Sequence, residues 1–311
     1  MKTMKSPSKR WRPRAAFTLL LILLLAGPAA AQKINVVTTI PDLADITRRI
    51  GEEKVSVHSL TLGVRDIHSV QVKPSMVTRL NRADAVVLMG LSLEHAFLPA
   101  LLDVAANPRI ARGGIGYIDT STGVVPLKPP KTLSRKGGDI HPRGNPHYNL
   151  DPVLGKLIAR NIAEGLSKAH GEHRAFFMKN LQAYTAELDR RIPGWQKAAR
   201  GLDGVRFVSY HDDMAYFAKR YGMRLFGTLE VAAGIGPTPA HIVQLVERMK
   251  AARVPLVVYG TYPSRVPQRV AREAGAAVVP VPLYVGGRPG VDTYVKLIDY
   301  LVTHLSKAVA R

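Results

Sequence analysis

The sequence predicts an α/β protein of two lobes, each a parallel-type sheet flanked by helices, joined by a long rigid helix. Two observations lead to this prediction. In both halves of the 311-residue chain, short runs of β-branched and aliphatic residues alternate with segments of helical periodicity. Between the halves, residues 167–200 carry apolar side chains at spacings of three and four. A helix of that length, at about 1.5 Å per residue, extends roughly 45–50 Å, longer than one small domain is wide.

The N-terminal lobe is expected over residues 32–166. Its run 85–90 is continuously apolar and ends in glycine, which is typical of a buried parallel strand. Asp151 can cap a helix and Pro152 suits the first helical position, so a helix is expected over 152–166. The other elements of this lobe follow the same alternation, with strands over 34–40, 55–60 and 116–119 and helices over 42–50, 74–81 and 93–105.

The linking helix is expected over 167–201, where Pro193 could kink or end it. The C-terminal lobe, residues 202–311, repeats the alternation of the first. Gly222 predicts the end of one of its helices. We expect strands over 205–210, 225–229, 255–259 and 276–281, and helices over 214–221, 239–252, 264–274 and 294–309. In the first lobe, residues 121–146 are rich in Pro, Gly, Lys, Ser and Thr and predict a long surface loop.

Residues 1–31 have the order of a secretory signal peptide and are left out of the fold. Six basic residues and no acidic one precede a leucine-rich apolar run over 15–26, and Ala29-Ala30-Ala31 offers an A-x-A cleavage site. The apolar run is too short to span a bilayer comfortably, which argues against an uncleaved anchor. We therefore expect a monomer that is exported to the periplasm and cleaved before Gln32.

The composition restricts the chemistry of any site. The chain has no cysteine, so a metal site would have to use His, Asp, Glu or Tyr. No thiol is present to carry a lipid, so we expect a protein that is not a lipoprotein. The net charge is +21, yet the basic residues are scattered, unlike those of nucleic-acid binders. Attraction of this basic surface to anionic headgroups or an acidic partner stays open as an alternative.

Three histidines share one sequence context. His68 lies in the loop after a predicted strand, His147 lies just before a helix, and His211 ends a predicted strand. In open α/β sheets, ligands gather outside the carboxyl ends of the strands, so these side chains could converge between the lobes. Three imidazoles favour zinc among divalent ions, with a carboxylate or water in the fourth position. Three unrelated surface histidines are the alternative that spacing alone leaves open.

Other polar residues are weaker candidates. Glu230 lies at a strand end before a Gly/Pro-rich loop and could be the fourth metal donor or a residue that braces the loop. His141 is close to His147 in sequence and could bind metal transiently, although a surface position is the simpler reading. Asp212 and Asp213 could accept hydrogen bonds that orient ligating imidazoles. The remaining histidines are expected to be solvated or packed: His58, His95, His170, His173, His241 and His304.

Common catalytic and nucleotide-binding motifs are absent from the sequence. It contains no P-loop, no G-x-S-x-G elbow, no H-E-x-x-H helix and no Rossmann glycine fingerprint. The glycine-rich segment 286–290 is interpreted as a turn before the last helix. These observations favour a binding protein, and not an enzyme.

A set of short motifs occurs in a fixed order along the mature chain: Thr38-Thr39-Ile40-Pro41, Asp66-Ile67-His68, Lys73-Pro74-Ser75, Gly144-Asn145-Pro146-His147-Tyr148, Leu150-Asp151-Pro152 and Ser209-Tyr210-His211-Asp212. Over nearly its whole length the chain thereby resembles the periplasmic solute-binding proteins of zinc and manganese ABC transporters. The resemblance implies two lobes bridged by a rigid helix, with a metal held in the cleft by His68, His147 and His211. It also implies delivery of the metal to a membrane permease.

The chain departs from this family pattern in two places. Many members have a late aspartate ligand near the last strand, but residues 281–287 contain no carboxylate here. Glu230 or water is then the option for the fourth donor, and we expect Glu230. The long histidine-rich loop of some zinc members is also missing.

The sequence therefore predicts a high-affinity zinc-binding protein, with Zn²⁺ as cargo rather than as a catalytic cofactor. Three histidines resemble the zinc members of the family more than the carboxylate-rich manganese members. The alternatives are a manganese- or iron-binding protein of the same class, a zinc-dependent hydrolase, and an interaction protein that works through its basic surface.

Overall fold

The computed structural model describes residues 1–4, 32–129, 141–232, 234–261 and 264–310. Most of the expected signal peptide and the middle of the expected loop 121–146 lie outside these ranges. The chain divides into two compact units, Met1–Lys33 and Ile34–Arg311, and the second unit holds the elements described below. Within the described ranges, no helix combines the length and the apolar character needed to cross a membrane.

The first sheet contains four parallel strands in the order β2-β1-β3-β4. The strands are β1 Ile34–Thr38, β2 Val55–Ser59, β3 Ala85–Leu88 and β4 Tyr117–Asp119. All four residues of β3 are buried, as expected for a continuously apolar run inside a parallel sheet. β2 and β3 lie on opposite sides of β1, so the strand order reverses at β1. In parallel α/β sheets such a switch point creates a crevice at the carboxyl ends of the strands.

The second sheet repeats this topology in the order β6-β5-β7-β8, also fully parallel. Its strands are β5 Arg206–Ser209, β6 Arg224–Thr228, β7 Leu256–Gly260 and β8 Ala277–Val281. The switch point now lies between β5 and β7. The two parallel sheets confirm the predicted α/β fold of two lobes.

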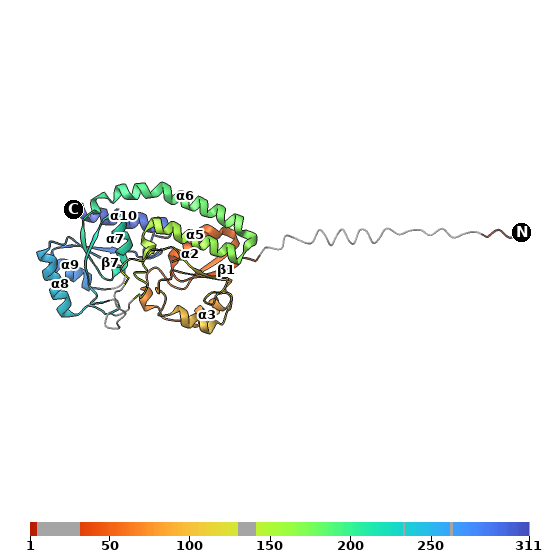
Figure 1. The fold of residues 1–311 in the computed structure, drawn as a ribbon, viewed down its shortest axis with the longest axis horizontal. Helices are drawn as coiled ribbons and strands as arrows, with labels where there is room; N and C mark the ends of the chain where they lie inside the picture. The colour runs from red at the N-terminus through yellow and green to blue at the C-terminus, as the bar shows by residue number, and fades with distance from the viewer. Residues whose placement is uncertain (5–31, 130–140, 233, 262–263, 311) are drawn as a thin grey trace. The chain divides into compact units, whose positions relative to one another are not determined.

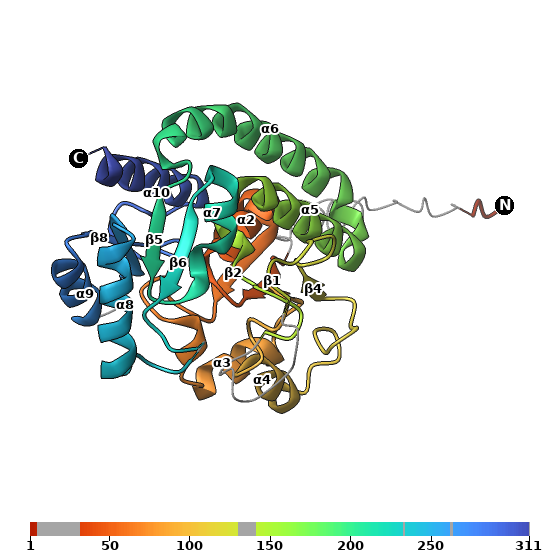
Figure 2. The ribbon, with the colours of Figure 1, turned by 60° about the vertical axis from the view of Figure 1, so that its left-hand side comes forward.

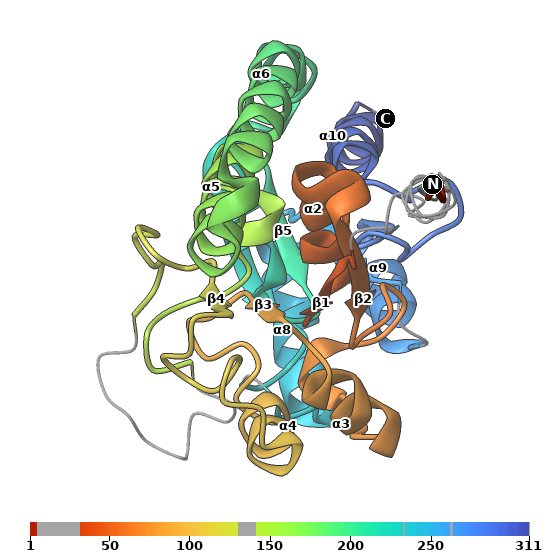
Figure 3. The ribbon, with the colours of Figure 1, turned by 90° about the vertical axis from the view of Figure 1, so that its right-hand side faces the viewer.

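Helices cover the sheets, and their bounds follow local signals in the sequence. Asp151 accepts a hydrogen bond from Val153 N at the start of α5, as its capping position predicts. Figure 3 shows α5 and α2 between the long helix α6 and the first sheet, with α3 and α4 on the other side. Figure 2 shows the helices of the second lobe around β5 and β6. The helices are α2 Pro41–Gly51, α3 Pro74–Asn81, α4 Leu98–Ala105, α5 Pro152–Ala169, α7 Ala215–Tyr221, α8 Pro239–Ala251, α9 Val266–Ala274 and α10 Tyr294–Val309.

The start of α4 differs from the prediction. The helix was expected from residue 93 but begins at Leu98. The preceding segment is held in turns, because the buried carboxylate of Glu94 accepts hydrogen bonds from the backbone N–H groups of Met89 and Gly90. Leu91 and Ser92 adopt left-handed backbone conformations there, with φ of 50° and 69°. A helix cannot pass through such a segment.

The long helix α6 spans Arg174–Ala198 and runs from the end of α5 to the neighbourhood of α10 (Figure 1). The expected single stretch from 167 is wrong at its start, because α5 continues to Ala169 and a short turn at Gly171–His173 separates the helices. Pro193 lies inside α6 without ending it. The predicted apolar positions of α6 face the core: Phe177, Leu181, Tyr184, Leu188 and Trp195 are buried.

Polar contacts tie α2 to the C-terminal half of the chain. The Asp42 carboxylate accepts hydrogen bonds from the side chain of Asn149 (3.1 Å) and from Val285 N (3.0 Å). Asp45 accepts one from Tyr294 N (2.8 Å). Burial nevertheless raises the pKa of Asp42 to about 7, because the few donors do not replace the lost water.

The Asp42 carboxyl is expected to make stability pH-dependent. Between about pH 4 and 7 the unfolded chain releases the Asp42 proton while the folded protein retains it, so this group lowers stability as the pH rises. Asp42→Asn should flatten the decline in the free energy of unfolding, by up to about 1.4 kcal/mol per pH unit. Urea unfolding of metal-free protein across this range checks the prediction. Parallel pH profiles for wild type and variant would contradict it.

Candidate metal centre

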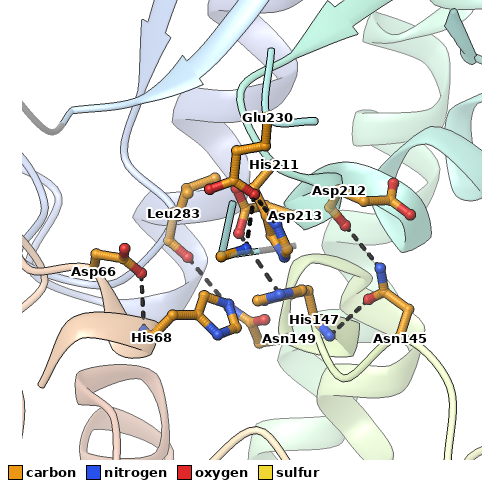
Figure 4. Close-up of polar contacts among 11 residues, drawn as sticks. Asp66, His68, Asn145, His147, Asn149, His211, Asp212, Asp213, Glu230 and Leu283 are labelled. Atoms are coloured by element: carbon orange, nitrogen blue, oxygen red, sulfur yellow. Dashed lines mark hydrogen bonds and ion pairs between the residues drawn. The ribbon is translucent and has the colours of Figure 1, made fainter. Parts of the chain in front are cut away.

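The three histidines expected to converge between the lobes lie beside one another. His68 lies on a short 3-10 turn, Ile67–Ser69, after β2. His147 directly precedes the 3-10 turn Tyr148–Leu150 that leads into α5, and His211 follows β5. Figure 4 shows their rings pointing into one space, with Glu230 and Asp213 on the side of the second lobe. Ring centroids are 4.9 Å apart for His68 and His211 and 5.3 Å apart for His147 and His211.

A fourth histidine joins this cluster. One ring nitrogen from each of His68, His141, His147 and His211 lies within 4.8 Å of the others. Donors bound to one Zn²⁺ at about 2.0–2.1 Å in tetrahedral geometry are about 3.4 Å apart, so small side-chain rotations suffice to close this set on one cation. The sequence favoured a surface position for His141, with transient metal binding as the other option, and the one signal for the latter was its closeness to His147 in the chain. We call these four residues the histidine cluster.

Short hydrogen bonds position the loops that carry the cluster. Asp66 Oδ1 accepts from His68 N (2.9 Å), and Asn145 Oδ1 accepts from His147 N (2.9 Å). The amide of Asn145 also donates to the backbone oxygen of Asp212, 2.7 Å away in the second lobe (Figure 4). One asparagine therefore links the His147 loop to the loop that begins with His211.

His147 is the most buried member of the cluster, with 2% of its surface exposed. Its Nε2 is buried and has no hydrogen-bond partner among the described residues. Burial, followed by the neighbouring imidazoles of His211, His68 and His141, holds the pKa of His147 well below its usual value. The ring is therefore neutral at physiological pH, which is the state that a metal ligand requires.

His211 has the opposite electrostatic environment. Burial lowers its pKa, but the carboxylates of Asp213 and Glu230 outweigh burial and raise the pKa to about 9. Its Nδ1–H donates to Glu230 Oε2 at 2.9 Å. This pairing fixes the tautomer that directs Nε2 away from Glu230, and metal-ligating histidines commonly have such a carboxylate partner.

The expected carboxylates are found in different roles. Glu230, expected as the fourth donor, lies against His211 and also accepts a 3.4 Å hydrogen bond from Gly234 N. Asp212, expected to orient an imidazole, instead pairs with Lys128 Nζ at 2.7 Å. Asp213 has an oxygen 3.7 Å from His147 Nε2. In the late segment without a carboxylate, the backbone oxygen of Leu283 accepts from the side chain of Asn149.

A cavity of about 230 Å³ opens beside the cluster. Carboxylates of both lobes line it, and these negative charges favour entry of cations. The lining includes Asp66, His68, Tyr210, His211, Asp213 and Glu230.

The sequence model of one family, described as zinc-uptake complex component A, periplasmic, matches residues 36–308. The chain belongs to this family. FimA of Streptococcus parasanguinis, a metal ABC transporter substrate-binding lipoprotein, is 28% identical over 278 residues, covering 87% of this chain and 86% of FimA. PsaA of Streptococcus mitis, a manganese ABC transporter substrate-binding lipoprotein, is 26% identical over 298 residues, covering 91% of each chain.

Solved structures show the same fold. A crystal structure of ZnuA has a TM-score of 0.74 and 26% identity, covering 89% of this chain and all of that one. A ZnuA deletion mutant with zinc bound also has a TM-score of 0.74, with 27% identity, 89% of this chain and 98% of that chain covered. The resemblance stated from sequence motifs is therefore confirmed.

The relatives correct one expectation. We expected a protein that is not a lipoprotein, because the sequence has no cysteine. FimA and PsaA are named as lipoproteins, which contradicts that expectation for a member of this family. The absence of cysteine from this sequence does not show how members of the family are anchored. An extracellular or periplasm-facing location is consistent with these relatives.

Binding of a divalent metal by the histidine cluster should release a proton near neutral pH. His211 is protonated below pH 9 or so in the metal-free protein, and a ligating imidazole must be neutral. The apparent affinity should therefore rise about tenfold per pH unit between about pH 6 and 8. Calorimetric titrations in two buffers of different ionisation enthalpy measure the proton released. Glu230→Gln should make the dependence shallower, and an affinity independent of pH would contradict the account.

Proposed function

We propose that this protein binds one Zn²⁺ ion between its lobes and delivers it to the membrane permease of an ABC transporter. The observation that supports this most directly is the histidine cluster, with three members in the first lobe and His211 in the second. The family description and the zinc-bound ZnuA neighbour support the same function. Manganese is the alternative cargo, because PsaA is named for it.

The donor set favours zinc. Four neutral imidazoles match the tetrahedral nitrogen coordination of Zn²⁺, whereas Mn²⁺ prefers carboxylate, carbonyl and water oxygens. In this proposal His68, His141, His147 and His211 are the four donors. Glu230 was expected from the sequence to be a metal donor. In this proposal it instead accepts a hydrogen bond from the Nδ1–H of His211 and places a negative charge next to the ion.

The placement of the donors also suits capture and release. We place the lobes at 32–166 and 202–311, with 167–201 as the connecting segment. An ion held by donors of both lobes stabilises their closed arrangement, so binding and lobe closure are linked. Contact with the permease would release the ion by moving His211 away from the first-lobe histidines, or by returning a proton to His211.

Each single substitution His68→Ala, His147→Ala or His211→Ala is expected to weaken Zn²⁺ binding at least 100-fold or so, because each removes one donor from a closed shell. Competition with a chromophoric chelator measures the affinity of the protein at one-to-one stoichiometry. His58→Ala is the matched control, since His58 is an exposed histidine of the first lobe. Equal affinities for the control and the cluster variants would refute the assignment.

A further inference from the structure

Asp213 is a buried carboxylate that lies beside His147 and the imidazole of His211. It lies on the 3-10 turn Asp212–Met214, two residues after His211, and only 7% of its surface is exposed. No hydrogen bond reaches its side-chain oxygens from any residue that the structure describes. The distance from Asp213 Oδ1 to His147 Nε2 is 3.7 Å, which is too long for a hydrogen bond.

Two groups with unused bonding capacity thus meet inside the protein. An ionised carboxylate buried without a hydrogen bond is costly, and so is a buried imidazole nitrogen without one. Burial raises the pKa of Asp213, although the neighbouring imidazoles of His211 and His68 lower it. A cation between Asp213 and His147 would satisfy both groups at once.

The other carboxylates near the histidine cluster each use one oxygen in a hydrogen bond or ion pair. Glu230 accepts from His211, Asp212 pairs with Lys128, and Asp66 accepts from His68 N. Among the carboxylates that line the cavity, Asp213 is therefore the one for which neither oxygen accepts a hydrogen bond from a described residue.

We propose that Asp213 is a fifth donor when the site holds Mn²⁺, and that its oxygen allows the site to bind this ion in addition to Zn²⁺. This inference rests on the proposed metal site. Donors of one ion are separated by about 3.0–3.5 Å, so the 3.7 Å between Asp213 Oδ1 and His147 Nε2 needs only a small closing movement. Zinc is complete with four imidazoles, whereas manganese takes more donors and prefers oxygen, so Asp213 matters more for manganese.

The test compares Asp213→Ala and Asp213→Asn with wild type, using the mature protein freed of metal by a chelator. Zn²⁺ affinity is measured by chelator competition and Mn²⁺ affinity from the electron paramagnetic resonance signal of the free ion. Both variants should lose Mn²⁺ affinity by about 30-fold or more and Zn²⁺ affinity by less than about fivefold. Asp212→Asn is the matched control, because its carboxylate pairs with Lys128, and it should leave both affinities near wild type.

A purely structural role for Asp213 predicts different results. In that case Asp213→Asn would lower both affinities by the same factor and would reduce the melting temperature of the metal-free protein. A donor role predicts instead that the Mn²⁺ affinity falls far more than the Zn²⁺ affinity. Equal losses for the two ions, or no loss of Mn²⁺ binding, would overturn the inference and leave zinc binding by the histidine cluster intact. A wild-type protein that binds neither ion would overturn both proposals.

Discussion

The convergence of four imidazoles in one buried space is the feature on which the rest of this site depends. His147 shows the constraint most clearly, since its Nε2 is buried without a hydrogen bond from any described residue. Burial and the neighbouring imidazoles lower the pKa of His147, so its ring is neutral and could bind a divalent cation. The two neighbouring carboxylates have different roles. Glu230 fixes the tautomer of His211, and Asp213 stays available beside His147.

The fold brings these side chains together because both sheets have the same topology. In each sheet the strand order reverses beside the first strand, so each lobe presents loops at the carboxyl ends of its strands. Buried polar contacts then join the halves. Asp42 and Asp45 hold the C-terminal segment, and Arg220 forms two hydrogen bonds with Asp151. These contacts join the first half of the chain to the second half away from the histidine cluster.

Much of this organisation could be predicted from local sequence signals. Continuous apolar runs such as 85–90 predicted buried parallel strands, and the helix at Tyr294–Val309 has the predicted bounds. His68, His147 and His211 were identifiable because each adjoins a strand end or a helix start, where topology fixes the position of a side chain.

Features that depend on tertiary contacts could not be predicted. His141 lies four residues before Asn145, whose backbone pairs with Leu127, and no periodicity encodes this contact. The late start of α4 depends on the hydrogen bonds to Glu94, a buried carboxylate that looks like an ordinary helical residue in the sequence. The position of Glu230 against His211, rather than among the clustered nitrogens, likewise required the three-dimensional arrangement.

The central claim is that four imidazoles form the zinc shell. A crystal structure of the zinc-loaded protein tests it most directly. The account predicts one Zn²⁺ with nitrogens of His68, His141, His147 and His211 at about 2.0–2.1 Å, and with the Glu230 oxygens more than about 3 Å away. An ion bound by Glu230 in place of His141, or bound away from His147, would contradict it.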